Sequence, residues 1–201
     1  MKIGFIGLGI MGKPMARNLL KAGVELMVND VNRSVVEELA AEGAKAAARQ
    51  EIGAACDVVF TILPNGAIVQ DVLFGGDGVA ASLKAGAIVC DCSSVTPTES
   101  HTCADKLAEA GVGFVDAPVS GGEPGAVNGT LAFMAGGAQK DFDALKPYFD
   151  IMGSSALLVG GTGSGSVTKL ANQVIVNNTI AVVSEAFVLA AKAGADPVKV
   201  Y

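Results

Sequence analysis

Three glycines close to the start of the sequence have the spacing of a phosphate-binding turn. Gly7, Gly9 and Gly12 follow a short apolar run and precede a segment of helix-forming residues. In such a turn the first glycine allows the sharp bend, the second lets a pyrophosphate approach the backbone, and the third lets the helix pack on the strand. The start of the helix offers unpaired N–H groups to the phosphates. The residues assigned to this site are Gly7, Leu8, Gly9, Ile10, Met11 and Gly12.

An acidic residue stands where the partner of this turn is expected. Asp30 ends a second apolar run, roughly 20 residues beyond the turn, as a dinucleotide site requires. A carboxylate there accepts hydrogen bonds from a ribose 2′-hydroxyl and repels a 2′-phosphate, whereas Arg33 could pair with that phosphate. We therefore expect NAD as the cofactor, with NADP possible, and Asn29 and Asp30 complete the site. A glycine-rich loop without a ligand is the alternative.

A lysine near the start of a long helical segment is suited to proton transfer. Lys169 is followed by Asn172 and Gln173, and this spacing puts the three side chains on one helix face. A lysine ammonium beside a carbonyl can polarise it and donate a proton as a hydride arrives. The residues alone leave open the alternative of a solvated lysine.

A third set of candidates lies in loops that follow predicted strands. Ser120 offers a hydroxyl, and Gly121 and Gly122 offer unshielded backbone N–H groups, a combination that suits a small carboxylate. The segments 63–65 and 93–96 also follow strands, where ligands bind in open parallel sheets. An ordinary turn is the alternative for each of them.

These candidates require a framework of alternating strands and helices. The expected strands are Lys2–Ile6, Leu26–Asp30, Val58–Leu63, Ile88–Asp91, Phe114–Asp116, Leu131–Ala135 and Ala156–Val159. The expected helices are Met11–Ala22, Arg33–Glu42, Gln50–Ala55, Ala67–Phe74, Thr98–Ala110 and Gln139–Tyr148. This alternation predicts an α/β fold with a doubly wound, mostly parallel sheet and right-handed crossovers.

The last part of the sequence predicts one helix of nearly 30 residues, from Ser166 to Gly194. Apolar residues surround it from Val174 to Ala191, which is typical of a helix that is buried on all sides. Several polar residues argue against a membrane span; they are Asn172, Gln173, Asn177, Asn178, Ser184 and Glu185. We expect the cover of this helix to lie outside the 201 residues or in another subunit, so a homo-oligomer is favoured.

Composition excludes several classes of function. The chain is 51% hydrophobic and 17% charged, with a net charge of −6 and no cluster of Lys and Arg, so a nucleic-acid partner is not expected. The four cysteines lack the spacing of a zinc site, and no metal is expected. We interpret them as buried thiols of a cytoplasmic protein. The single histidine, His101, is interpreted as a surface residue.

Four motifs together resemble the β-hydroxyacid dehydrogenase family over the whole sequence. They are GFIGLGIMGKPMARNLL (Gly4–Leu20), TILPN (Thr61–Asn65), DAPVSGGEPGAVNGTL (Asp116–Leu131) and GSGSVTKLANQ (Gly163–Gln173). The resemblance implies a Rossmann-type NAD-binding domain over residues 1–162. It implies that residues 163–201 form an interdomain helix and the start of an all-helical C-terminal domain.

The resemblance also implies roles for particular residues. The first motif would bind the cofactor phosphates, the second and the loop after Ile88–Asp91 would line the nicotinamide, and Ser-Gly-Gly would hold the carboxylate of a small aldehyde or hydroxyacid. Lys169 would be catalytic. Carried over, the remaining residues are Leu63, Pro64, Asn65 and Val95 for the cofactor, and Ser120, Gly121, Gly122, Asn172 and Gln173 for the substrate.

Within the family, KLANQ is most similar to the branch that reduces tartronate semialdehyde to glycerate. Many relatives have a second Asn where this sequence has Gln173, which leaves open whether Asn172 or Gln173 faces the substrate. A dehydrogenase of 3-hydroxyisobutyrate or another semialdehyde is the alternative, and so is a cofactor-binding protein without activity. The stretch Gly121–Ala126 also resembles 6-phosphogluconate dehydrogenase, but Ala171 stands where that enzyme usually has His.

Overall fold

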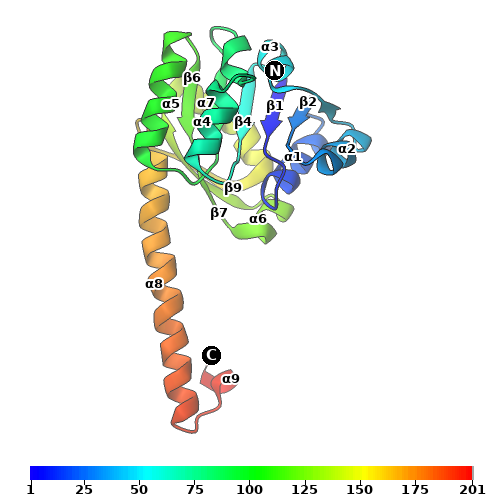
Figure 1. Ribbon diagram of the computed structural model, residues 1–201. Helices are drawn as coiled ribbons and strands as arrows, with labels where there is room; N and C mark the ends of the chain where they lie inside the picture. The colour runs from blue at the N-terminus through cyan, green and yellow to red at the C-terminus, as the bar shows by residue number, and fades with distance from the viewer. Residues whose placement is uncertain (201) are drawn as a thin grey trace.

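The computed structural model describes residues 1–200 as an α/β body from which one long helix projects (Figure 1). Its strands are β1 (Ile3–Ile6), β2 (Leu26–Asn29), β3 (Lys45–Ala46), β4 (Val58–Thr61), β5 (Ile88–Asp91), β6 (Gly113–Asp116), β7 (Val119–Ser120), β8 (Leu131–Gly137) and β9 (Gly153–Gly160). Its helices are α1 (Gly12–Lys21), α2 (Arg33–Ala41), α3 (Arg49–Ala55), α4 (Gly66–Phe74), the 3-10 turn η1 (Val79–Ser82), α5 (Pro97–Glu109), α6 (Gly122–Asn128), α7 (Gln139–Met152), α8 (Ser164–Lys192) and α9 (Pro197–Val200).

The strands form one sheet in the order β3-β2-β1-β4-β5-β6-β8-β7, with β9 paired to β8. All pairs from β3 across to β6 are parallel, whereas β8 runs antiparallel to β6 and β7. The predicted doubly wound, mostly parallel sheet is confirmed. The chain winds outward in opposite directions from β1 and β4, so the switch point where ligands bind lies between these two strands.

Helices cover both faces of this sheet, and this explains why its strands are apolar without alternation. Phe5 and Phe60 lie in the core under α1, α2 and α7. Ile6 follows Phe5 in β1, and Val59 precedes Phe60 in β4. Both lie in the core under α3, α4 and α5. Successive side chains point to opposite faces, so each central strand contributes to both cores.

Some elements differ from the sequence prediction. The segment after Ser120, expected as a glycine-rich loop, contains α6. This helix ends at Asn128, and Gly129 caps it with a φ of +66°, in the left-handed region that glycine tolerates. α7 continues past its predicted end at Tyr148 because Phe149 and Met152 are fully buried. β3 and β7 have two residues each and are too short to give a recognisable period.

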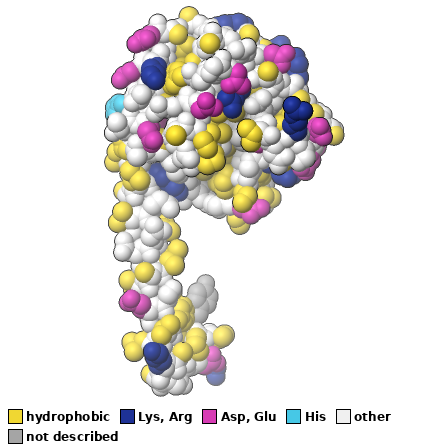
Figure 2. Space-filling model, viewed as in Figure 1, with side chains coloured by type: hydrophobic (Ala, Val, Ile, Leu, Met, Phe, Trp, Pro, Cys, Tyr) yellow, Lys and Arg dark blue, Asp and Glu magenta, His cyan; other side chains and the backbone are white. Residues whose placement is uncertain are grey.

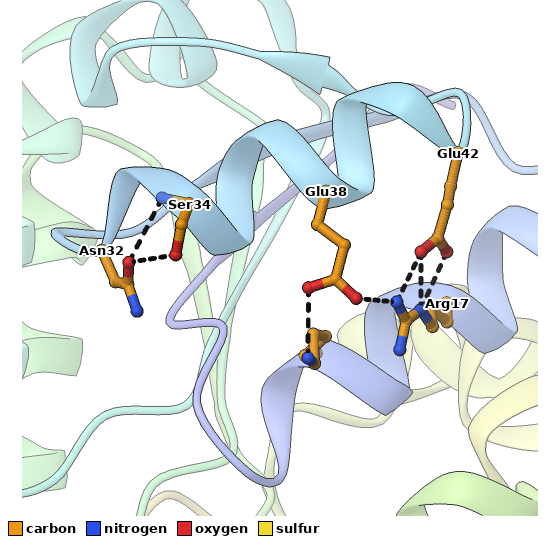
Figure 3. A network of polar contacts seen from close by, with 6 residues as sticks. Arg17, Asn32, Ser34, Glu38 and Glu42 are labelled. Atoms are coloured by element: carbon orange, nitrogen blue, oxygen red, sulfur yellow. Dashed lines mark hydrogen bonds and ion pairs between the residues drawn. The ribbon is translucent and has the colours of Figure 1, made fainter.

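α1 and α2 are tied together by a charged network on the surface (Figure 3). Arg17 of α1 binds both Glu38 of α2 and Glu42 just after it, and Lys13 Nζ lies 3.2 Å from Glu38 Oε2. Hydrogen bonds from Arg17 hold the pKa of both glutamates below its ordinary value. Asn32 caps α2, because its Oδ1 accepts the Ser34 N–H at 3.2 Å. The ion pairs therefore join α1 to the C-terminal half of α2.

α8 leaves the body after its first turns (Figure 1). Gly165 and Ser166 are buried, but side chains further along, such as Ile175 at 67% and Leu189 at 71%, are exposed. Figure 2 shows hydrophobic side chains along the projecting part and few charged ones. By length and composition α8 could cross a membrane, a property that core helices of soluble proteins share. Among residues 1–200 most of its projecting part is exposed, and the expected domain division at residue 162 stays a prediction.

Candidate active site

A cleft of about 670 Å³ lies at the carboxyl ends of β1, β2 and β4. It contains most of the residues that the sequence assigns to a cofactor. Those on its wall are Gly7, Gly9, Ile10, Met11, Gly12, Asn29, Asp30, Leu63 and Pro64. Leu8 is buried behind the turn, and Asn65 and Val95 line a neighbouring cavity. Most of the predicted set therefore comes together around the switch point of the sheet.

The three glycines of the turn have different surroundings. A Cβ on Gly7, which has a φ of +98°, would lie 2.2 Å from the Ile62 carbonyl oxygen. A Cβ on Gly12 would lie 1.9 Å from the Gly7 carbonyl oxygen, whereas a Cβ on Gly9 would meet no heavy atom within 4 Å. Packing thus requires glycine at the outer positions, and the middle position is open to a ligand. Met11 gives α1 no side-chain cap. Pro14 has no N–H and the Lys13 N–H donates to the Gly9 carbonyl oxygen at 3.1 Å, so the Gly12 N–H is the donor of this first turn that fits a pyrophosphate.

Asp30 directly follows β2, which ends one residue before the predicted bound. Its Oδ2 accepts the Leu8 N–H at 2.6 Å, and its Oδ1 accepts the Asn32 N–H at 2.7 Å. An ionised carboxylate has about four acceptor positions, so both bonds leave capacity for the hydroxyls of a ribose. The side chain of the neighbouring Asn29 is held by a hydrogen bond within the protein, which its Nδ2 donates to the Ala47 carbonyl oxygen at 2.7 Å.

A second cavity, of about 520 Å³, joins the loops with the start of α8. It brings together the residues predicted to bind a carboxylate, Ser120, Gly121 and Gly122 (the carboxylate clamp), and the predicted catalytic residue Lys169, which is far from them in the sequence. Its predicted site residues are Met11, Leu63, Pro64, Ser120, Gly121, Gly122, Lys169 and Gln173. A third cavity, of about 240 Å³, has Asn65 and Val95 on one side and again Lys169 and Gln173 on the other.

Within α8 the geometry distinguishes the two amides that follow Lys169. Gln173 lines both cavities, whereas Asn172 lines neither and donates from Nδ2 to Gln173 Oε1 at 3.3 Å. Gln173 is therefore the amide that faces the cavity. Lys169 is half-buried, and loss of solvation lowers its pKa. No group of side chains able to hold a metal ion occurs among residues 1–200.

Sequence reasoning missed a buried network that positions the loop after β4. Asp91 Oδ1 accepts from Thr61 Oγ1 at 2.7 Å and from Ser93 Oγ at 2.5 Å, and Ser93 Oγ accepts the Leu63 N–H at 2.9 Å. Burial raises the pKa of Asp91, whose Oδ2 has no partner among the described residues. The available signal was a carboxylate at the carboxyl end of a strand with serine two residues later.

Another missed residue is Arg49, at the start of α3. Its side chain lines the 670 Å³ cleft predicted to hold the nucleotide (the nucleotide cleft) and is only 14% exposed. Asp71 and Asp77 hold its Nη1 at 3.2 and 3.0 Å. Nothing in the sequence indicates this position, because both partners come from α4 and the loop after it.

Comparison with known families gives two matches that cover nearly the whole chain. Residues 2–161 match the NAD binding domain of 6-phosphogluconate dehydrogenase. Residues 163–201 match the NAD-binding region of NADP-dependent 3-hydroxyisobutyrate dehydrogenase. The match to 6-phosphogluconate dehydrogenase concerns its NAD binding domain and does not indicate a sugar-phosphate substrate.

Individual relatives agree with these matches. The 2-hydroxy-3-oxopropionate reductase of Escherichia coli (strain K12) is 45% identical over 201 residues, which is 100% of this chain and 68% of the relative. The 2-(hydroxymethyl)glutarate dehydrogenase of Eubacterium barkeri is 44% identical over 98% of this chain and 65% of the relative. Among solved structures, Mycobacterium tuberculosis 3-hydroxyisobutyrate dehydrogenase with L-serine has a TM-score of 0.91 and 33% identity, covering 97% of this chain and 66% of that one. The chain spans about two thirds of the length of these relatives.

Proposed function

The chain belongs to the β-hydroxyacid dehydrogenase family of NAD(P)-dependent oxidoreductases, and from this premise we propose that it reduces tartronate semialdehyde to glycerate. The observation that carries the proposal is the cavity shared by Ser120, Gly121, Gly122, Lys169 and Gln173 beside the nucleotide cleft. Similarity to the Escherichia coli reductase supports the choice of aldehyde.

In this proposal the Ser120 hydroxyl and the N–H groups of Gly121 and Gly122 bind the substrate carboxylate. Both glycines have positive φ values, +130° and +59°, which turn the backbone into a concave donor surface that residues with a Cβ rarely form. Gln173 offers its amide to the substrate hydroxyl, and the carboxylate clamp orients the aldehyde carbon toward the cleft.

Lys169 completes the reaction as the general acid. Its ammonium donates a hydrogen bond to the aldehyde oxygen, which stabilises the negative charge that develops there, and then donates the proton. The lowered pKa of this lysine makes its ammonium a stronger acid. When bound, the nicotinamide supplies the hydride.

NADH is proposed as the preferred cofactor over NADPH. Asp30 already accepts two backbone N–H groups, which hold its carboxylate at the edge of the cleft where a ribose 2′-phosphate would be repelled. The preference is modest, because Arg33 lies three residues further and carries the opposite charge.

The test of the proposed function is the full-length protein with NADH and a panel of semialdehydes. Tartronate semialdehyde should give the highest kcat/KM, and Lys169→Ala should lower kcat by about 10²–10⁴-fold with little change in NADH affinity. A higher kcat/KM for another semialdehyde would select the 3-hydroxyisobutyrate-type alternative. Cofactor binding without turnover of any aldehyde would select a non-enzymatic role.

For the projecting helix, we propose a cytoplasmic protein in which α8 is covered by protein rather than lipid. Asn177, Asn178 and Glu185 interrupt its apolar surface and are costly in hydrocarbon. Burial of an aliphatic side chain such as Ile175 or Leu189 stabilises by roughly 1.5–3 kcal/mol, so the exposed helix should drive association. Light scattering on residues 1–201 should give a dimer or larger species, and a monomer would contradict the proposal.

A further inference from the structure

The first turn of α8 is capped by a residue from another part of the chain. Gly163 is its N-cap residue and provides no side-chain cap. Asp116, at the carboxyl end of β6, supplies that cap instead: its Oδ1 accepts the Gly163 N–H at 2.7 Å and its Oδ2 accepts the Ser166 N–H at 2.8 Å. The side chain is completely buried, so water does not compete for these bonds.

Close packing leaves this turn little freedom. A Cβ on Gly165 would lie 2.3 Å from the Met134 carbonyl oxygen and 2.4 Å from the Asp116 carbonyl oxygen. Ser166 Oγ lies 3.0 Å from Ser100 Oγ of α5, and both hydroxyls are buried. The start of α8 is thus held against β6, β8 and α5 together.

The two catalytic elements diverge from this point. Going forward from Asp116, the chain reaches Ser120 and the carboxylate clamp after one short segment. On the other side of the hydrogen bond from Ser166 to Asp116, α8 continues from Ser166 and reaches Lys169 three residues later. Asp116 therefore links the backbone that carries the clamp to the helix that carries the lysine.

We propose that Asp116 is a positioning residue, whose hydrogen bonds to the amides of Gly163 and Ser166 fix Lys169 relative to the Ser120–Gly122 clamp. The inference rests on the proposed function of Lys169. Burial raises the pKa of Asp116 and the two N–H donors oppose that rise, as expected for a carboxyl placed to accept them. Displacing a reacting group by about 1 Å can cost about a hundredfold in rate, so small movements of the turn matter.

The test compares Asp116→Asn with Asp141→Asn in the full-length protein. Asp141 is a matched control, because its carboxyl is also largely buried and lies against Gly113 at the opposite end of β6. Asp116→Asn should lower kcat about tenfold to a hundredfold, leave the KM for NADH within twofold, and speed hydrogen exchange at the amides of Gly163 and Ser166. Asp141→Asn should leave kcat and both amides unchanged.

A double-mutant cycle with Lys169→Ala separates positioning from general stability. If Asp116 acts through the lysine, Asp116→Asn should cost almost nothing further in the Lys169→Ala background. Should Asp116→Asn not fold, Asp116→Glu, which moves the carboxylate by one methylene, takes its place with the same expectations. Unchanged kcat, or an equal loss in both backgrounds, overturns the inference. Full activity of Lys169→Ala alone would instead overturn the proposed function.

Discussion

The glycine turn permits one substitution to be tested at two positions with opposite expected results. In Gly9→Ala the new methyl projects into open space, so the free energy of unfolding should stay within about 0.5 kcal/mol of wild type. In the proposed binding mode, that same methyl takes the space of the pyrophosphate. Loss of one charge-assisted hydrogen bond costs about 1.5–3 kcal/mol, so the Kd for NADH should rise about tenfold to a hundredfold.

In Gly12→Ala the methyl would lie 1.9 Å from the Gly7 carbonyl oxygen and 2.8 Å from Ile62 Cγ2. α1 must move to relieve these contacts, and overpacking of this kind costs about 1–3 kcal/mol. For a protein of this size each kcal/mol lowers the Tm by about 2–4 °C. Gly12→Ala should therefore lose stability in the absence of any ligand, which Gly9→Ala should not.

The assay combines thermal denaturation followed by circular dichroism with NADH titration. The chain has no tryptophan, so binding is measured from the fluorescence of the nicotinamide itself. Wild-type affinity in Gly9→Ala would show that the pyrophosphate does not pass this residue. Wild-type stability in Gly12→Ala would refute the packing argument.

Three further predictions concern the chemistry of the site. Ser120→Ala removes one donor from the carboxylate clamp and should raise the KM for the semialdehyde about tenfold, in line with about 1.5 kcal/mol for a hydrogen bond to a charged group; equal turnover of a decarboxylated analogue by wild type would contradict the clamp. In the proposed mechanism aldehyde reduction needs protonated Lys169, so kcat should fall as pH rises through the pKa of this lysine. Because burial lowers that pKa, the alkaline limb of the pH profile should lie below the pKa of an exposed lysine. Asp30→Asn should raise kcat/KM for NADPH relative to NADH, and an unchanged ratio would show that the carboxylate does not select the cofactor.

Features that depend on neighbouring residues in the sequence were predictable. β5 has the predicted bounds, because the length of a short apolar run favours a buried strand over a helix. The glycine turn was equally clear, since the spacing of its three glycines between a strand and a helix can be read within one local stretch of sequence. α6 was missed although Gly122–Asn128 is also local, because its glycines at both ends resemble a loop more than a helix.

Features that depend on contacts between distant segments were not predictable. Thr61 donates to Asp91 only because β4 and β5 are neighbours in parallel register, whereas the bond from Ser93 is local. The choice between Asn172 and Gln173 depends on how α8 is rotated about its axis, and spacing along one helix cannot determine this. Placement of Lys169 in the cavity has the same origin, because the sheet determines where α8 begins.

The rotation of α8 is set at its buried first turn rather than along its apolar length. Gly165 admits no side chain there, and the two oxygens of Asp116 accept amide hydrogens from opposite ends of that turn. A helix held in this way has one rotational setting, in which Lys169 and Gln173 face the cavity while Val174 and Ile175 remain exposed. In the proposed mechanism this polar anchor determines which residues of α8 face the substrate cavity, and the apolar surface beyond the anchor is the surface that we propose for association.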